Sequence, residues 1–256
     1  AASTSSPASV GWWSCGCHPS TPIPPSCSRP RAAVAAGTAP RSVPAVRGVS
    51  LEVPRGKVTA VVGESGGGKS TLVYGILRLL PPGTEMSGSI DYDGMELTRA
   101  SEERMREFRW KKAALVTQGA MNSLTPVLPG GYQVAEVLRV RLGMPGGEAR
   151  ERALELLAMT NLPPGYAGKY PHELSGGEKQ RAVISMAVAC SPEFLIADEP
   201  TSALDVITQA EVIATLVRMV REKGMGLLLV THDLPLALSI SDEMAVKHEG
   251  RLVEKG

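Results

Sequence analysis

The sequence lacks several features that would place the protein in a specialised class. Its 256 residues contain no run of 18 uninterrupted apolar residues, which excludes a transmembrane helix. Four cysteines are too few for a disulfide scaffold. Lysine and arginine number 27 against 26 acidic residues, so the net charge of +1 gives no bulk attraction for nucleic acid or an anionic membrane. With 43% hydrophobic and 21% charged residues, the chain is typical of a globular protein, and we expect no nucleic-acid partner.

Acidic residues are absent before Glu52, and this absence marks a change in composition. Residues 1–44 contain three arginines, no lysine and 8 of the 20 prolines, and 31 of these 44 residues are Ala, Ser, Thr, Pro or Gly. Neither a period of two nor one of 3.6 is sustained there. We therefore expect a low-complexity leader at 1–44, disordered or non-native, and a conventional domain at 45–256 with 24 basic and 26 acidic groups.

Three other interpretations of the leader are disfavoured, and the first of them, a secretory signal, lacks the apolar core of about 7–15 residues that it needs. The leader's serine, arginine and missing acids fit a transit peptide, but the amphipathic pattern of such peptides is absent. A metal site formed by Cys15, Cys17, His18 and Cys27 lacks a paired CxxC or a second ligand pair.

From residue 45 onward, strands alternate with helices. Short β-branched or apolar runs predict strands, and apolar residues at helical spacing predict helices. This order predicts a parallel-sheet core with a helical subdomain inserted at about 118–190. The predicted strands are 58–62, 89–92, 113–117, 194–197 and 226–231, with a hairpin at 243–253. The predicted helices are 72–80, a short one capped by Ser101, 133–142, 147–161, 178–190 and 206–223, with a loop at 119–132.

A glycine-rich segment after the strand at 58–62 matches G-x-x-x-x-G-K-[ST]. Glycines allow backbone N–H groups to approach phosphate oxygens, and the following helix adds its positive end. Lys69 can reach the β- and γ-phosphates, and the Ser70 hydroxyl can coordinate Mg²⁺. A flexible turn is the competing interpretation, which the flanking strand and helix disfavour. The expected nucleotide-binding residues here are Gly63, Glu64, Ser65, Gly66, Gly67, Gly68, Lys69, Ser70 and Thr71.

Two carboxylates follow the apolar run Phe194-Leu-Ile-Ala. Successive side chains of a strand point to opposite sides, so Asp198 and Glu199 can have different roles. We expect Asp198 to hold Mg²⁺ and Glu199 to polarise the attacking water. Taken alone, such acids could equally cap a helix.

A third motif, Leu174-Ser-Gly-Gly-Glu-Lys-Gln-Arg181, precedes that strand. Ser175, Gly176 and Gly177 open a predicted helix, whose bare N–H groups form an anion site. An ordinary helix cap would look the same.

Together these residues resemble the nucleotide-binding subunit of ABC transporters over about residues 45–256. The phosphate loop, Gln118, Leu174-Ser-Gly-Gly, Asp198-Glu199, Ser202-Ala-Leu-Asp205 and His232 occur in that family's order. The resemblance implies an α/β fold: a P-loop NTPase core with a mostly parallel sheet, an inserted helical subdomain and a small antiparallel β portion.

The resemblance also implies roles for single residues. Glu199 would be the catalytic base, Gln118 would contact Mg²⁺ and the attacking water, and His232 would contact the γ-phosphate. Metal ligands would be Ser70, Gln118 and Asp198. Ser175, Gly176, Gly177 and Glu178 would bind the γ-phosphate of a second copy, with Asp205 at the dimer seam.

A narrower resemblance points to the peptide and nickel importer branch, through Gln118-Gly-Ala-Met-Asn-Ser-Leu-Thr-Pro126 and Pro171-His-Glu-Leu-Ser-Gly-Gly. It implies ATP and Mg²⁺ as cofactors. The implied partners are transmembrane permease subunits and a second ATPase subunit, which is the same chain or a paralogue. A solute-binding protein would be an indirect partner. The location implied is the cytoplasmic face of the cell membrane, as a peripheral protein.

The chain departs from this family at both ends. The family stacks adenine on an aromatic residue before the phosphate loop, but no Phe, Tyr or Trp lies between Trp13 and the loop. Peptide-importer members also continue beyond the final hairpin, so we expect a C-terminally truncated chain. Two alternatives therefore stay open: a non-transport ABC-type ATPase, and a partial copy with weak, poorly adenine-selective nucleotide binding.

Overall fold

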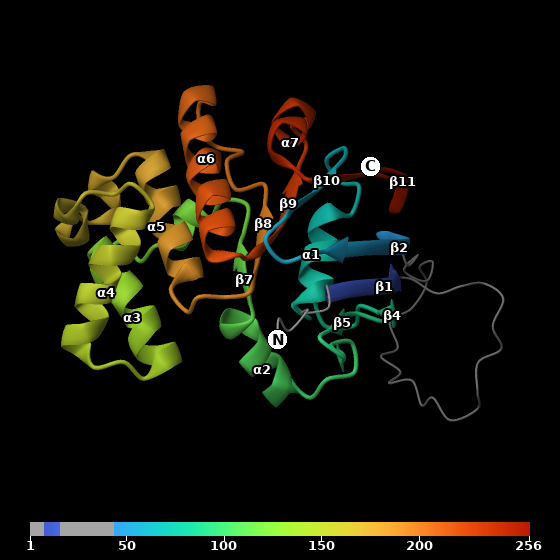
Figure 1. Ribbon diagram of the computed structural model, residues 1–256, viewed down its shortest axis with the longest axis horizontal. Coiled ribbons are helices and arrows are strands. Elements are labelled where there is room, and N and C mark those ends of the chain that lie inside the picture. Colours follow the sequence, from blue (N-terminus) through green and yellow to red (C-terminus); the bar gives the residue numbers. More distant parts are fainter. Residues whose placement is uncertain (1–7, 16–43) are drawn as a thin grey trace, which may run out of the picture.

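The computed structural model describes the backbone of residues 8–15 and the whole of residues 44–256. Its centre is a six-stranded sheet with the order β11-β10-β3-β9-β8-β7, shown in Figure 1. The five strands from β10 to β7 are parallel, and β11 pairs antiparallel with β10. The strands are β3 (Val58–Val62), β7 (Ala113–Val116), β8 (Phe194–Asp198), β9 (Gly226–Thr231), β10 (Glu243–His248) and β11 (Arg251–Lys255).

All residues of β3, β8 and β9 are buried, as expected for central strands of a sheet covered on both faces. The α/β class with a mostly parallel sheet is therefore confirmed. Among the described residues, no helix combines the length and apolar character needed to cross a membrane.

A smaller antiparallel part lies beside this sheet. Strand β1 (Ala8–Cys15) lies between β2 (Val46–Val53) and β4 (Ser87–Gly88). The structure thus has a strand at Ala8–Cys15 within the predicted leader, and the description of residues 1–44 as disordered or non-native stays a prediction. Backbone pairing with β2 and β4, which are distant in sequence, supplies hydrogen bonds that local composition does not reveal. Residues 1–7 and 16–43 lie outside the described residues, and so do Cys17, His18 and Cys27.

The predicted strand at 89–92 is also corrected, because the chain forms three two-residue strands there. These are β4, β5 (Asp91–Tyr92) and β6 (Met95–Glu96), of which β5 and β6 form a hairpin. Positive φ angles at Gly88, Asp93 and Gly94 turn the backbone and prevent one continuous strand.

Helix positions agree with the sequence where caps are strong. Helix α2 (Glu102–Lys111) begins after Ser101, which accepts a hydrogen bond from the Arg104 N–H, and α6 (Val206–Lys223) ends at Gly224 with φ 63°. Helix α1 (Lys69–Ile76) begins and ends earlier than the predicted 72–80, because Gly68 caps it and Arg78 has a positive φ. Helix α7 (Leu234–Ile240) was not predicted.

Three helices lie between β7 and β8 in the chain and form the helical part at the left of Figure 1. They are α3 (Gly130–Leu142), α4 (Gly146–Met159) and α5 (Gly176–Val188), so the predicted loop at 119–132 is shorter than expected. Buried residues of these helices, such as Leu138 and Leu157, share one apolar cluster with Leu195 and Leu229 of the sheet. The helical part is therefore packed onto the core, and its boundaries at 118 and 190 stay a prediction.

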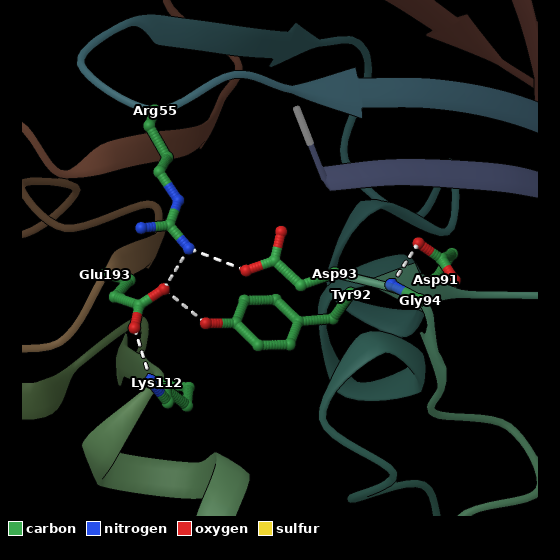
Figure 2. A network of polar contacts seen from close by, with 7 residues as sticks. All are labelled: Arg55, Asp91, Tyr92, Asp93, Gly94, Lys112 and Glu193. Carbon is green, nitrogen blue, oxygen red and sulfur yellow. Dashed lines mark hydrogen bonds and ion pairs between the residues drawn. The ribbon is translucent and has the colours of Figure 1, made fainter. Parts of the chain in front are cut away.

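A polar network joins the antiparallel part to the parallel sheet (Figure 2). Glu193, directly before β8, accepts hydrogen bonds from Arg55, Tyr92 and Lys112. Arg55 also pairs with Asp93 at 2.8 Å. One carboxylate thus ties together the turn after β2, the β5–β6 hairpin and the end of α2.

Candidate functional site

The phosphate loop connects β3 to α1, and the backbone geometry there depends on glycine. Gly66 and Gly68 have φ angles of 79° and 80°, which L side chains rarely adopt. A Cβ on Gly63 would overlap the carbonyl oxygen of Lys247 on β10. The loop is therefore a tight turn at the carboxyl end of a buried strand, with the N-terminus of α1 behind it.

Lys69 is the first residue of α1, and its side chain is only 4% exposed. Its Nζ donates to the carbonyl oxygens of Gly63 at 2.7 Å and Glu64 at 2.8 Å. It also lies 3.9 Å from Oε1 of Glu199. The ammonium group is thus held inside the curve of the loop, where an anion would be bound.

Asp198, the last residue of β8, is 1% exposed. Burial raises the pKa of its carboxyl group above the usual range, against an opposing hydrogen bond from Ser70. Its Oδ1 is buried and has no hydrogen-bond partner within the described part of the chain. A buried acceptor without a partner is costly, so this oxygen indicates a ligand position.

Glu199 follows directly and collects three polar side chains. The Gln118 Nε2 donates to its Oε2 at 3.2 Å, and the His232 Nδ1 lies 3.3 Å from its Oε1, with Lys69 on the same oxygen. Glu199 has a positive φ of 47°, unusual for a side chain of this kind, and its N–H donates to the Val230 carbonyl at 2.8 Å. The backbone thus turns the carboxylate towards the phosphate loop.

These residues fit Mg²⁺ bound together with a nucleotide. Mg²⁺ prefers oxygen ligands, keeps several waters and usually takes only one or two protein carboxylates beside phosphate oxygens. The unpartnered Asp198 oxygen and the adjacent Ser70 hydroxyl match that demand. Within the described ranges, no group of three or more His, Cys, Asp or Glu is placed to hold a metal ion.

The second set of predicted residues lies elsewhere. Ser175 caps α5 in a capping box with Glu178. Burial acts to raise the pKa of Glu178, but the hydrogen bonds from Tyr166 and Ser175 outweigh it and lower the pKa. Asp205 caps α6, and its hydrogen bonds from Thr208 lower its pKa. A Cβ on Gly177 would overlap Thr208, so the starts of α5 and α6 touch.

The two predicted sets are not brought together within one chain. In Figure 1, α5 and α1 lie on opposite sides of α6. The structure therefore brings together Lys69, Ser70, Gln118, Asp198, Glu199 and His232, and separately Ser175–Glu178 with Asp205.

Sequence reasoning missed two features of the site. Lys247 is fully buried behind the phosphate loop, although a lysine in a strand normally marks an exposed face. Asp233 accepts hydrogen bonds from the Leu236 N–H, which caps α7, and from the Gln209 Nε2 at 3.2 Å. The Asp-Leu-Pro sequence could have indicated that cap, whereas no local signal marks Lys247.

Comparison with known proteins gives the following similarities. The family model described as ABC transporter matches residues 46–202. A Brucella abortus protein whose name assigns it to peptide import as an ATP-binding protein is 44% identical over 228 residues, covering 86% of this chain and 68% of that protein. The dipeptide transport ATP-binding protein DppD of Escherichia coli is 40% identical over 215 residues, covering 83% and 66%. The chain spans about two thirds of the length of these curated relatives.

Solved structures give the same result. The ATP-binding cassette MJ0796, in a dimeric post-hydrolysis state bound to ADP and Pi, has a TM-score of 0.73 and 29% identity. The match covers 86% of this chain and 94% of that one.

Proposed function

Because this chain belongs to the ABC transporter family of ATP-binding proteins, we propose that it binds and hydrolyses ATP and drives import of peptides through partner permease subunits. The observation that carries the proposal is the convergence of Lys69, Gln118 and His232 on Glu199, beside the phosphate loop. Nickel is the second substrate class, which the sequence resemblance leaves open.

In the proposed reaction the phosphate loop and Lys69 bind the triphosphate. Glu199 takes a proton from a water that attacks the γ-phosphorus, while the bond from that phosphorus to the ADP oxygen breaks. ADP and phosphate are the products. Gln118 and His232 fix the carboxylate and orient the water. Asp198 and Ser70 would hold Mg²⁺, which when bound neutralises charge on the β- and γ-phosphate oxygens.

Ser175 and Gly176 are exposed on another part of the molecule, so we assign the segment from Ser175 to Glu178 to the nucleotide of a second subunit. Two subunits would then enclose two ATP molecules head to tail. The chain would act as a peripheral subunit at the cytoplasmic face of the membrane, with the permease and, indirectly, a solute-binding protein as partners.

The first prediction concerns Glu199→Gln. We expect steady-state hydrolysis to fall by at least about 100-fold, because the variant loses the general base. ATP binding should persist, since the phosphate loop is unchanged. Malachite-green phosphate release and a nucleotide titration measure the two properties. Glu222→Gln, on an exposed position of α6, is the matched control; full hydrolysis by Glu199→Gln would contradict the role assigned here.

The same titration tests the alternatives. Base–aromatic stacking is worth about 1–3 kcal/mol, so a chain without that contact would bind ATP and GTP weakly and nearly equally. Tight, adenine-selective binding would exclude a copy with impaired nucleotide binding. Co-purification of DNA rather than permease subunits would favour a non-transport ATPase.

A further inference from the structure

Lys247 on β10 lies directly beneath the phosphate loop, with no exposed surface. A Cβ on Gly68 would lie 2.7 Å from its Nζ, and the Lys247 carbonyl oxygen lies against Gly63. The lysine therefore supports both ends of the loop, although 178 residues separate it from Lys69 in the chain. The mechanism proposed above does not use it.

The Lys247 amino group donates two hydrogen bonds to backbone carbonyls. One goes to Gly67 in the loop, and the other goes to Ala45 at 3.0 Å, directly before β2. Within the described chain all peptide bonds are trans. In a trans peptide the C=O and the following N–H point in opposite directions. Holding the Gly67 carbonyl inward therefore turns the Gly68 N–H outward, to the side where phosphate would be bound.

Lys247 also places positive charge behind the loop. Within the described part of the chain its hydrogen-bond acceptors are the two backbone carbonyls, and no acidic side chain pairs with it. Burial, and then the charge of Lys69, lower the pKa of Lys247 to about 8. Other charged residues on neighbouring elements are Arg47, Glu64, His248 and Arg251, and Lys69 is the charged residue that lowers the pKa of Lys247. A polyphosphate in the loop would offset this repulsion between the two lysines.

We infer that Lys247 is a positioning residue of the nucleotide site, which orients the Gly67–Gly68 peptide towards the phosphates and adds a buried positive charge behind them. The inference rests on the proposed ATP-binding function. A cation on the carbonyl also polarises the peptide, which makes its N–H a better donor.

The test is a calorimetric titration of the full chain with Mg·ADP. We expect Lys247→Met, which removes the charge at similar volume, to bind ADP about 5- to 10-fold more weakly at pH 7, as expected for loss of one charge-assisted hydrogen bond. Lys247→Gln keeps a hydrogen-bond donor without the charge, so its affinity for ADP should lie between those of the wild type and Lys247→Met. Lys255→Met, at an exposed position of β11, is the matched control and should leave affinity unchanged.

The pH dependence separates this role from simple support of the fold. The wild-type affinity should fall as the pH rises from 7 to 9.5, because the amino group loses its proton, whereas Lys247→Met should show little change. The unaltered protein should take up protons on binding ADP at pH 8.5, measured in buffers of different ionisation enthalpy. This measurement does not depend on whether the variants fold.

Three outcomes would overturn the inference. The first is equal affinity and equal pH dependence in wild type and Lys247→Met. The second is an absence of proton uptake by wild type that binds ADP. In both cases the proposed function stands. The third is a wild-type chain that binds no ADP from pH 7 to 9.5, which would overturn the proposed function together with this inference.

Discussion

At the scale of a single residue, the buried carboxylate of Asp198 lowers the stability of the fold although it belongs to the proposed site. Its carboxylate is buried with one oxygen unpartnered, and burial raises its pKa. A carboxylate whose pKa is raised on folding stabilises the fold at pH values below the unfolded pKa. That contribution is lost as the pH rises through the folded pKa. Above its folded pKa the ionised carboxylate therefore lowers the free energy of unfolding until a cation binds.

We predict that Asp198→Asn increases the free energy of unfolding at pH 7 by about 1 kcal/mol in EDTA, a rise of roughly 2–4 °C in Tm. The same variant should lose the stabilisation that Mg·ATP gives the wild type. Differential scanning calorimetry with and without Mg·ATP measures both effects. Asp91→Asn, in the β5–β6 hairpin, should change neither, and a destabilised Asp198→Asn variant in EDTA would contradict the argument.

At the scale of elements, Glu193 connects the antiparallel part of the molecule to the parallel sheet (Figure 2). Its side chain is 23% exposed, so its ion pairs with Arg55 and Lys112 are partly shielded from solvent. Burial acts to raise its pKa, but hydrogen bonds from Lys112 and Tyr92 and the charge of Arg55 outweigh burial and lower the pKa. A carboxylate whose pKa is lowered on folding stabilises the fold at pH values above its unfolded pKa of 4.5. That stabilisation is lost as the pH falls through the folded pKa.

For Glu193→Gln we predict a loss of about 1–2 kcal/mol in the free energy of unfolding at pH 7. The difference from wild type should shrink as the pH falls below 4.5 and the wild-type carboxylate takes up its proton. Urea unfolding at a series of pH values gives this curve. Glu254→Gln, exposed on β11, is the control. A difference that stays constant down to pH 3 would show that the ionised carboxylate is not the cause.

The contact between α5 and α6 gives a second prediction at this scale. A Cβ on Gly177 would overlap Cγ2 of Thr208. Gly177→Ala should therefore destabilise the protein by about 1–3 kcal/mol, as overpacking does. Thr208→Ser removes that methyl group and keeps the hydroxyl, so the double variant should regain most of the loss in a urea double-mutant cycle. If Gly177→Ala lowers the free energy of unfolding equally in the wild type and in Thr208→Ser, the strain does not come from the Thr208 methyl group.

At the scale of the whole molecule, the two groups of site residues are separate in one chain. Proposed binding of Ser175–Glu178 to a second subunit's nucleotide would unite them. We predict that Glu199→Gln dimerises with Mg·ATP and remains monomeric with Mg·ADP, because the γ-phosphate is the bridging group. Light scattering after size-exclusion chromatography measures the mass.

A matched variant tests the surface that forms this dimer. Glu199→Gln with Ser175→Arg places a bulky side chain at the α5 terminus and should bind ATP yet stay monomeric. Dimerisation that is unaffected by Ser175→Arg would place the interface on another face of the molecule.

Elements with strong local signals were predicted well. The bounds of α6 were predicted as Val206–Lys223 from a long amphipathic period that ends at Gly224, and the structure adds that Asp205 caps its start. Helix α7 was missed because seven residues are too few to show a helical period. The strand in residues 8–15 was missed because its pairing partners lie 30 or more residues away.

The sequence by itself determined the phosphate loop, the carboxylate pair after β8 and the caps of α2, α5 and α6. These depend on short-range chemistry: glycine conformations, hydroxyl and carboxylate caps, and the alternation of a strand. The tertiary structure alone decided that Gln118 and His232 meet at Glu199, and that Lys247 lies beneath Gly67. Those contacts follow from placing β7 and β9 on either side of β8, and β10 beside β3, an order set by long-range strand pairing that no local pattern encodes.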